Sequence, residues 1–405
     1  MPQFFNIETF IKTHITKRSE SFFAQDLQTH HKTLINEIQG KTALVIGGAG
    51  TIGSSFIKQL IRYNPAKVVV VDINENGLTE LTRDVRSRND ILVPKDFITY
   101  PINFNDEIFY KFFERDKPFD IVANFAAHKH VRSEKDVYCI EAMINNNVIN
   151  AKRLLDVLVA NKPKHFFCVS TDKAANPVNI MGASKKLMED LIMSYSDILP
   201  IKTARFANVA FSNGSLLAGF IERMFKQQPL SCPRDVKRFF VSPEESGQIC
   251  LLACILGKSG DIFFPKLDEE KDLVTFASAV PHFLNLFGLE VDECVSEEEA
   301  KDKASNFSSN KYPVYFFKSD SDGEKLYEEF YTDDEDYDTE KYYSLGVIKK
   351  GKTTEAEYIQ NVINEMKQLF ANTQQINKQQ VVDILNKAIP TFNHINTGIS
   401  LDSKM

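Results

Sequence analysis

Three features that would assign the chain to particular classes of protein are missing from its sequence. The 405 residues carry a formal net charge of −7, so there is no overall basic excess of the kind that draws proteins to nucleic acids. No apolar run reaches about 18 residues, the length that suggests a membrane-spanning helix. Residues 1–5 lack the basic start and apolar core of a secretory signal. We therefore expect a cytoplasmic protein with no membrane span and no nucleic-acid partner.

The sequence also lacks a pattern of metal ligands. Its six cysteines include no CxxC pair, and Cys250 and Cys254 lie in an apolar run with helical spacing, which favours buried core thiols. His128 and His130 have no third ligand at a suitable spacing. The acidic run at residues 333–336 could bind a cation, but a solvated turn is the more ordinary interpretation. We therefore expect no metal site and a reducing environment.

From residue 41 onward, short apolar runs alternate with helical patterns. The runs occupy residues 43–46, 67–72, 98–102, 120–124, 165–170 and 201–206. Continuous apolar runs are typical of parallel strands, because helices cover both faces of a parallel sheet. The alternation predicts an α/β fold with a Rossmann-like doubly wound parallel sheet.

A glycine-rich turn directly follows the first of these runs and precedes the first helical segment. It comprises Gly47, Gly50, Thr51, Ile52 and Gly53. Glycines allow the backbone to turn tightly and to approach a pyrophosphate, and the helix N-terminus presents free N–H groups and a partial positive charge. The turn therefore predicts a dinucleotide-binding site.

An acidic residue at the end of the second run supports this prediction. Asp72 follows Gly53 by 19 residues. A carboxylate there can accept hydrogen bonds from a ribose diol and would repel a 2′-phosphate, which favours NAD over NADP. NADP stays possible because Arg83 and Arg86 follow nearby. The structural alternative is that Asp72 caps a helix.

We expect the chain to have four parts. They are an N-terminal helical extension at residues 1–40, an NAD-binding Rossmann domain at 41–230, a smaller α/β substrate-binding cap at 231–350 and a C-terminal helical tail at 351–405.

The ends of the fourth and fifth runs carry the residues with the most chemistry. Ligands bind outside the carboxyl ends of the strands in such a sheet, so Ala126, Asp172 and Lys173 should meet in one crevice. Ala126 is small enough to let the backbone pass close to a nicotinamide. Burial could leave Lys173 neutral near pH 7 and able to abstract a proton, while Asp172 acts as an acid. The alternative is a surface ion pair.

Met181 and Lys185 lie one helical turn apart on the same face. The ammonium of Lys185 can bond to the hydroxyls of a nicotinamide ribose. A Tyr-x-x-x-Lys pair supplies the acid and base of short-chain dehydrogenases, but the thioether of Met181 carries no proton. The proton transfers therefore move to Asp172 and Lys173, which favours elimination of water over simple oxidation.

Taken together, these motifs resemble the nucleotide-sugar 4,6-dehydratases of the extended short-chain dehydrogenase/reductase superfamily, in the polysaccharide-biosynthesis branch that acts on UDP-N-acetylglucosamine. Several members of this branch also carry methionine at the position of Met181. The matching segments run in family order at residues 47–53, 126–131, 170–177, 179–185, 205–209, 237–240 and 323–329.

The resemblance implies a role for each candidate residue. Asp172 would protonate the departing 6-hydroxyl, Lys173 would remove the C5 proton, and Thr171 would bond the 4-hydroxyl of the sugar. Lys185 would hold the nicotinamide ribose. The remaining positions are Asn103, which stands where the family commonly has an aspartate that touches adenine, Asn147, which would fix the active-site backbone, and Lys129, Asn208 and Arg238 near the sugar or diphosphate.

The implied reaction is an internal redox cycle with bound NAD. Hydride leaves C4, water is lost across C5 and C6, and hydride returns to C6, which gives a 4-keto-6-deoxy sugar. Two other hypotheses stay open: an epimerase or oxidoreductase acting at C4 or C5, and a cofactor-bound scaffold. Ala207 and Phe211 depart from the family pattern near the substrate loop, so the identity of the sugar stays open too. Family members are often dimers or larger, and we expect a homo-oligomer.

Overall fold

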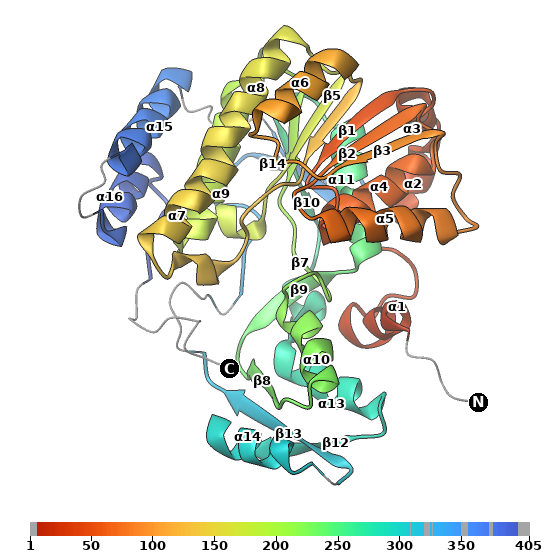
Figure 1. The fold of residues 1–405 in the computed structure, drawn as a ribbon, viewed down its shortest axis with the longest axis vertical. Helices are drawn as coiled ribbons and strands as arrows, with labels where there is room; N and C mark the ends of the chain where they lie inside the picture. The colour runs from red at the N-terminus through yellow and green to blue at the C-terminus, as the bar shows by residue number, and fades with distance from the viewer. Residues whose placement is uncertain are drawn as a thin grey trace.

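A nine-stranded sheet organises the structure, a computed structural model that describes residues 6–307, 309–319, 325, 327–349, 355–371 and 376–395 (Figure 1). Within these ranges the strand order is β14-β15-β10-β6-β5-β4-β1-β2-β3. The strands from β3 to β10 run parallel, and β15 and β14 complete one edge in antiparallel pairing. Their bounds are β1 Thr42–Ile46, β2 Lys67–Val71, β3 Asp96–Tyr100, β4 Ile121–Asn124, β5 His165–Val169, β6 Ile201–Ala204, β10 Asp261–Pro265, β14 Tyr337–Asp338 and β15 Leu345–Ile348.

Helices cover both faces of this sheet. Figure 1 shows α6, α8 and α9 on one face and α4, α5 and α11 on the other. The central strands are therefore buried on both sides, which explains their continuous apolar sequences. This arrangement confirms the predicted Rossmann-like doubly wound parallel sheet. The helix bounds are α4 Thr51–Ile61, α5 Glu75–Ser87, α6 Glu107–Asp116, α7 Val137–Ile144, α8 Asn150–Ala160, α9 Ile180–Ser194 and α11 Pro243–Leu256.

A smaller α/β part lies beyond the carboxyl ends of the central strands (Figure 1). It has its own apolar core, in which the rings of Phe211 and Phe220 contact Phe283, and Phe276 contacts Phe240. Its two three-stranded sheets have the orders β11-β9-β7 and β12-β13-β8. The bounds are β7 Asn208–Val209, β8 Leu230–Pro233, β9 Lys237–Val241, β11 Leu273–Thr275, β12 Glu290–Cys294, β13 Lys311–Phe317, α10 Leu216–Phe225, α12 Glu269–Asp272, α13 Phe276–Asn285 and α14 Glu297–Ser305.

The expected cap at residues 231–350 is divided between the two parts of the molecule. Helix α11 packs against α4, and strands β10, β14 and β15 belong to the large sheet. The contact between the helices is close, because a Cβ added at Gly247 would lie 2.4 Å from the carbonyl oxygen of Ser55. A single boundary at residue 230 is therefore too simple, since the buried strand β10 finds its partners in the large sheet.

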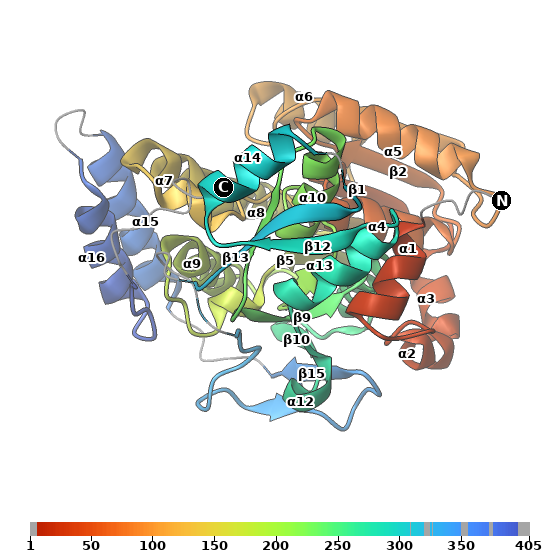
Figure 2. The ribbon, with the colours of Figure 1, turned by 90° about the horizontal axis from the view of Figure 1, so that it is seen from below.

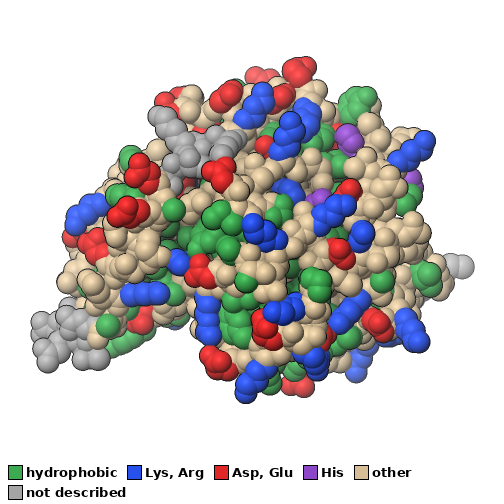
Figure 3. All heavy atoms as spheres, turned by 90° about the horizontal axis from the view of Figure 1, so that it is seen from above, with side chains coloured by type: hydrophobic (Ala, Val, Ile, Leu, Met, Phe, Trp, Pro, Cys, Tyr) green, Lys and Arg blue, Asp and Glu red, His purple; other side chains and the backbone are tan. Residues whose placement is uncertain are grey.

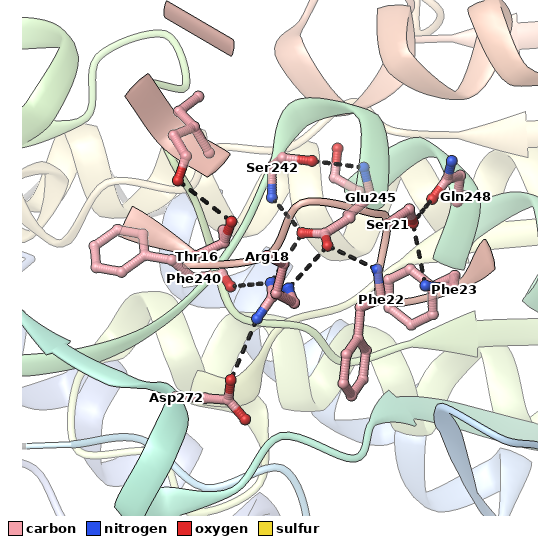
Figure 4. Close-up of polar contacts among 12 residues, drawn as sticks. Thr16, Arg18, Ser21, Phe22, Phe23, Phe240, Ser242, Glu245, Gln248 and Asp272 are labelled. Atoms are coloured by element: carbon pink, nitrogen blue, oxygen red, sulfur yellow. Dashed lines mark hydrogen bonds and ion pairs between the residues drawn. The ribbon is translucent and has the colours of Figure 1, made fainter. Parts of the chain in front are cut away.

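The N-terminal extension is helical and contacts both parts. It contains α1 Ile7–Phe10, the π-helix η1 Ile11–Ile15, α2 Ala24–Thr29 and α3 His31–Ile38. Arg18 lies in the segment between η1 and α2. It donates hydrogen bonds to Glu245 of α11 at 2.9 and 3.0 Å, to the carbonyl oxygen of Phe240 of β9 at 3.0 Å and to Asp272 of α12 at 3.3 Å (Figure 4). The extension thus ties strand β9 to a helix of the large sheet.

Two C-terminal helices, α15 Ala356–Ala371 and α16 Lys378–Ala388, pack against α9 (Figures 1 and 2). Their buried apolar residues join the core of the large sheet. On the face turned away from the smaller part, acidic and basic side chains are interspersed (Figure 3). Within the described ranges, every helix is too short or too polar to cross a membrane.

Candidate functional site

Two adjoining cavities open at the carboxyl ends of the central strands. The first has a volume of about 290 Å³, and its lining includes Ile52, Lys129, Thr171, Lys173, Met181, Lys185 and Asn208. The second has a volume of about 220 Å³, and its lining includes Gly47, Gly50, Asp72, Asn103 and Ala126. Phe125 and Ala127 line both cavities. Most of the residues predicted from the sequence therefore surround one extended space.

The glycine-rich turn packs closely against the end of β4. Gly47 has φ +73°, a conformation that favours glycine, and a Cβ there would lie 2.4 Å from the backbone nitrogen of Ala126. A Cβ at Gly53 would lie 2.3 Å from the carbonyl oxygen of Gly47. Gly50 differs, because its added Cβ would meet only ordinary contacts, but it lines the second cavity and precedes the first turn of α4. Packing therefore requires glycine at positions 47 and 53 but not at position 50.

Asp72 connects the turn to the start of α5. Its two carboxylate oxygens each accept one backbone N–H, from Ala49 and from Asn74, both at 2.9 Å. Asn74, and not Asp72, is the N-cap of α5, where it accepts the N–H of Gly77. A carboxylate has more acceptor sites than these two bonds use, so Asp72 can also bond to a ribose in the second cavity.

The acid and base candidates form a buried cluster at the end of β5. Asp172 begins the short helix η4 (Asp172–Ala174) and is 3% exposed. Its Oδ1 accepts hydrogen bonds from the Thr171 hydroxyl at 2.8 Å, from the Lys173 backbone N–H at 2.9 Å and from the Lys173 ammonium at 3.1 Å. On the other side of this ammonium, Glu328 Oε1 lies 3.5 Å from Nζ. Because both carboxylates are buried, the alternative of a surface ion pair is wrong.

Lys173 is charged in the ligand-free protein, whereas the sequence led us to expect a neutral amine. Burial alone would lower the pKa of Lys173, but the carboxylates of Asp172 and Glu328 outweigh burial and raise the pKa of this ammonium above its ordinary value. The nearby Arg238 guanidinium opposes them. Lys173 is therefore a cation when the cavity is open.

Glu328 is a site residue to which we assigned no role from the sequence. It is 4% exposed and lies 3.9 Å from Nη2 of Arg238, as well as beside Lys173. Arg238 also donates to the carbonyl oxygens of Lys237 and Lys325. The available signal was the matching segment at 323–329, of which Gly323, Glu324 and Leu326 lie outside the described residues. Asp172 and Arg238 are buried and are not among the residues that line the first cavity.

Met181 and Lys185 stand on the same face of α9, as predicted. Met181 is 2% exposed and lines the first cavity. The ammonium of Lys185 donates to the carbonyl oxygen of Val169 at 2.6 Å and lies 3.2 Å from the sulfur of Met188. Burial lowers the pKa of Lys185. From the π-helix η3 (Asn145–Ile149), Asn147 accepts the backbone N–H of His128 at 2.9 Å and donates to the carbonyl oxygen of His128 and to the hydroxyl of Ser184, both at 3.0 Å.

The segment after β4 and the loop before α10 close the other side of the first cavity. Lys129 donates to the carbonyl oxygen of Asn213 at 3.0 Å, and burial lowers the pKa of Lys129. Thr51 accepts the N–H of Asn213 at 2.9 Å. Beyond this loop lies a cavity of about 620 Å³, which shares Gly214, Ser215 and Leu216 with the first and is also lined by Arg132, Arg223 and Lys226.

A buried ion cluster supports the site from behind. Arg205, which is fully buried, bonds to Glu189, to Glu335 and to the carbonyl oxygen of Phe330. Glu189 in turn accepts the hydroxyl hydrogen of Ser170 at 2.9 Å. Glu335 belongs to the acidic run at 333–336, so that run contributes to an internal ion pair. The described residues contain no group of three or more His, Cys, Asp or Glu side chains placed to hold a metal ion.

Comparison with known proteins shows the family of the chain. Residues 43–350 match the family described as polysaccharide biosynthesis protein. An uncharacterized membrane protein of Methanocaldococcus jannaschii is 32% identical over 336 residues, which cover 77% of this chain and 87% of that protein. The capsular polysaccharide biosynthesis protein CapD of Staphylococcus aureus is 26% identical over 360 residues, which cover 87% of this chain and 54% of CapD. The chain therefore spans about half the length of that relative.

Two solved structures share the fold. Pen from Bacillus thuringiensis has a TM-score of 0.61 at 20% identity, with 82% of this chain and 98% of that chain covered. A tyrosine-to-phenylalanine mutant of the UDP-glucuronic acid 4-epimerase of Bacillus cereus, in complex with UDP-4-deoxy-4-fluoro-glucuronic acid and NAD, has a TM-score of 0.51 at 18% identity, with 79% of this chain and 99% of that chain covered. Because the family match spans most of the chain, the protein belongs to the polysaccharide biosynthesis protein family.

Proposed function

We propose that this chain is an NAD-dependent nucleotide-sugar 4,6-dehydratase, with UDP-N-acetylglucosamine as the first candidate substrate. Its product would be a 4-keto-6-deoxy sugar for surface polysaccharide or glycan synthesis. The observation that carries the proposal is the buried cluster of Thr171, Asp172, Lys173 and Glu328 beside Met181. The side chains of Asp172 and Lys173 can donate and accept protons, whereas the thioether of Met181 on the neighbouring helix α9 cannot.

The residues around the two cavities fit a dinucleotide. The turn from Gly47 to Gly53 leaves the first N–H groups of α4 available for a pyrophosphate. Asp72 faces the second cavity, where it would bond an adenosine ribose, and Asn103 lines the same space. Lys185 lines the first cavity, where it would hold the nicotinamide ribose. When bound, the nicotinamide supplies a hydride acceptor for C4 of the sugar and a hydride donor for C6, so the cofactor ends each turnover in its starting state.

The acid and base roles require the proton of the ion pair to move. In the ligand-free protein Lys173 holds the proton, because Asp172 and Glu328 raise its pKa despite burial. Elimination requires the opposite arrangement, with a neutral amine to take the C5 proton and a protonated acid to give a proton to the leaving 6-hydroxyl. A single transfer from Lys173 Nζ to Asp172 Oδ1, across 3.1 Å, produces that arrangement. A sugar that excludes water from the cavity favours it, because low polarity disfavours both charges.

The remaining polar residues position the sugar and its diphosphate. The hydroxyl of Thr171 donates to Asp172, so its oxygen is oriented to accept a hydrogen bond from the 4-hydroxyl of the sugar. Lys129 and Asn208 line the first cavity, where they would contact the sugar. Arg132, Arg223 and Lys226 line the adjoining larger cavity together with Glu222, which pairs with Lys226. The lining keeps a net positive charge, which suits a diphosphate.

Epimerisation at C4 or C5 is the second candidate, because a solved structure with this fold is a 4-epimerase with NAD and a UDP-sugar analogue bound. A 4-epimerase normally relies on a tyrosine to shuttle the proton of the 4-hydroxyl, and Met181 occupies that position. The observed cluster therefore favours dehydration. A homo-oligomeric state and a cytoplasmic location stay predictions.

The experiment that tests the proposal is product analysis. The purified protein is incubated with UDP-N-acetylglucosamine and, separately, with other nucleotide sugars, and the products are identified by mass spectrometry and NMR. Loss of one water together with a new C6 methyl group supports dehydration. An unchanged mass with one inverted stereocentre would overturn it in favour of epimerisation. No turnover of any sugar by protein that holds NAD would favour a scaffold.

A further inference from the structure

Glu134 fixes the start of the helix that carries Met181 and Lys185. It ends the short helix η2 (Val131–Glu134) and is 6% exposed. Its Oε1 accepts the backbone N–H of Met181 at 3.1 Å, and Asn179 accepts the next N–H, that of Gly182, at 2.7 Å. The first N–H groups of a helix have no partner within the helix, so these two bonds hold α9 in place. A carboxylate is the charge that this positive helix end favours.

The other oxygen of Glu134 is held from the C-terminal tail. Its Oε2 lies 3.4 Å from Nε2 of His394 and 3.6 Å from Nζ of Lys378. Lys378 begins α16, and His394 follows the end of that helix. A buried carboxylate needs such partners, because an unpaired charge in the protein interior is costly. Both partners lie outside residues 43–350, the part of the chain that matches the family.

The same tail is hydrogen-bonded to the connection between the catalytic cluster and α9. The N–H of Asn393 donates to the carbonyl oxygen of Pro177 at 3.0 Å, and that of Ile395 donates to Val178 at 2.9 Å. Phe392 is buried in the core of the large sheet. The tail therefore contacts the connection between η4 and α9 directly, and it contacts the first turn of α9 through Glu134.

From these contacts we infer that Glu134 is a positioning residue of the active site and that residues 376–395 form part of its support. Glu134 touches neither cavity. It acts through α9, whose first two turns place Met181 in the wall of the first cavity and Lys185 beside the expected nicotinamide ribose. A displacement of about 1 Å in reacting groups can cost about a hundredfold in rate. The kinetic part of the inference rests on the proposed function, and the structural part does not.

The kinetic test compares two substitutions of Glu134 with a control on the same tail. Glu134→Ala is expected to lower kcat by about tenfold to a hundredfold while the KM for the nucleotide sugar changes little, because the sugar contacts lie on other elements. Glu134→Gln keeps an acceptor for the Met181 N–H and is expected to restore part of kcat. The control is Lys387→Ala, which removes a solvent-exposed pair with Glu365 on α16 and α15 and should leave kcat unchanged.

A second measurement does not depend on turnover. Amide hydrogen exchange in the peptide that covers residues 178–185 should be faster in Glu134→Ala, and also in the double variant Lys378→Ala with His394→Ala, than in the wild type or in Lys387→Ala. The double variant keeps Glu134 and covers the case in which Glu134→Ala does not fold. Unchanged exchange in both variants would overturn the inference, as would a lower melting temperature of Glu134→Ala with kcat preserved. Faster exchange in an enzyme that turns over no sugar would refute the proposed function alone.

Discussion

Two glycines of the glycine-rich turn, Gly50 and Gly53, should respond differently to alanine, although they look equivalent in the sequence. A Cβ at Gly53 would lie 2.3 Å from the carbonyl oxygen of Gly47 and 2.9 Å from Cα of Gly48, so the backbone must move. Overpacking of this kind costs about 1–3 kcal/mol. Alanine recovers about 1 kcal/mol through its better helix propensity. We expect Gly53→Ala to lower the free energy of unfolding by up to about 2 kcal/mol.

Gly50→Ala is the matched comparison. Its nearest new contact would be 3.5 Å, to the carbonyl oxygen of Gly47, and its φ of −70° suits any residue. We expect the free energy of unfolding without cofactor to change by less than about 0.5 kcal/mol. Gly50 lines the second cavity, however, so we expect an added methyl group there to keep a pyrophosphate from at least one backbone N–H. Loss of one such charge-assisted bond, about 1.5–3 kcal/mol, corresponds to about a 10-fold to 150-fold weaker Kd for NAD.

Two assays separate these effects. Urea unfolding without cofactor gives the stability of each variant, and calorimetric titration with NAD gives the Kd. The prediction is a crossed result, with Gly53→Ala losing stability and Gly50→Ala losing affinity at full stability. If Gly50→Ala unfolds as easily as Gly53→Ala, or binds NAD as tightly as the wild type, the assignment of packing and cofactor roles is wrong.

The remaining predictions concern the catalytic cluster and the ions behind it. Lys173→Ala should abolish turnover while NAD stays bound, and retained activity would remove Lys173 from the base role. The wild-type protein should be active without a tyrosine at position 181. A large gain in turnover in Met181→Tyr would show that the site is built for different chemistry. Burial alone would raise the pKa of Glu189, but Arg205, Lys186 and Ser170 together lower it to about 2. The pKa of a glutamate in an unfolded chain is about 4.3, so the shift stabilises the folded protein by about 3 kcal/mol. This stabilisation is complete above about pH 4.3 and is lost as the pH falls through about 2. Glu189→Gln should therefore lower the free energy of unfolding at neutral pH and flatten its decline in acid, whereas an unchanged acid profile would contradict the ion-pair account.

The sheet and its turn were predictable because their signals are local. Each central strand is a continuous apolar run, and the turn from Gly47 to Gly53 combines a strand end, a helix start and glycines within a few residues. The same holds for Thr171, Asp172 and Lys173, which are consecutive, and for Met181 and Lys185, which share one face of α9.

The contacts that determine the charge of the site were not predictable in this way. Glu328 lies far from Lys173 in the sequence. The chain brings the two residues together only after it has formed most of the smaller part. The prediction that Lys173 is a neutral amine was wrong for that reason, because the carboxylates of Asp172 and Glu328 lie beside its ammonium. The partners of Glu134 come from the C-terminal tail. Amphipathic spacing in α16 predicts that this helix packs against the protein, but it does not identify the element against which the helix packs. The return of β10 and β15 to the large sheet likewise depends on long-range pairing.

The most direct test of the central claim is NMR analysis of the product formed from UDP-N-acetylglucosamine in deuterated water. Proton removal at C5 by Lys173, followed by reprotonation from solvent, predicts a 4-keto-6-deoxy sugar with deuterium at C5. The hydrogen that returns to C6 comes from C4 of the same sugar, so the new methyl group should gain no deuterium from the solvent. A product of unchanged mass apart from exchange, with an inverted centre at C4 and the 6-hydroxyl still present, would contradict the account.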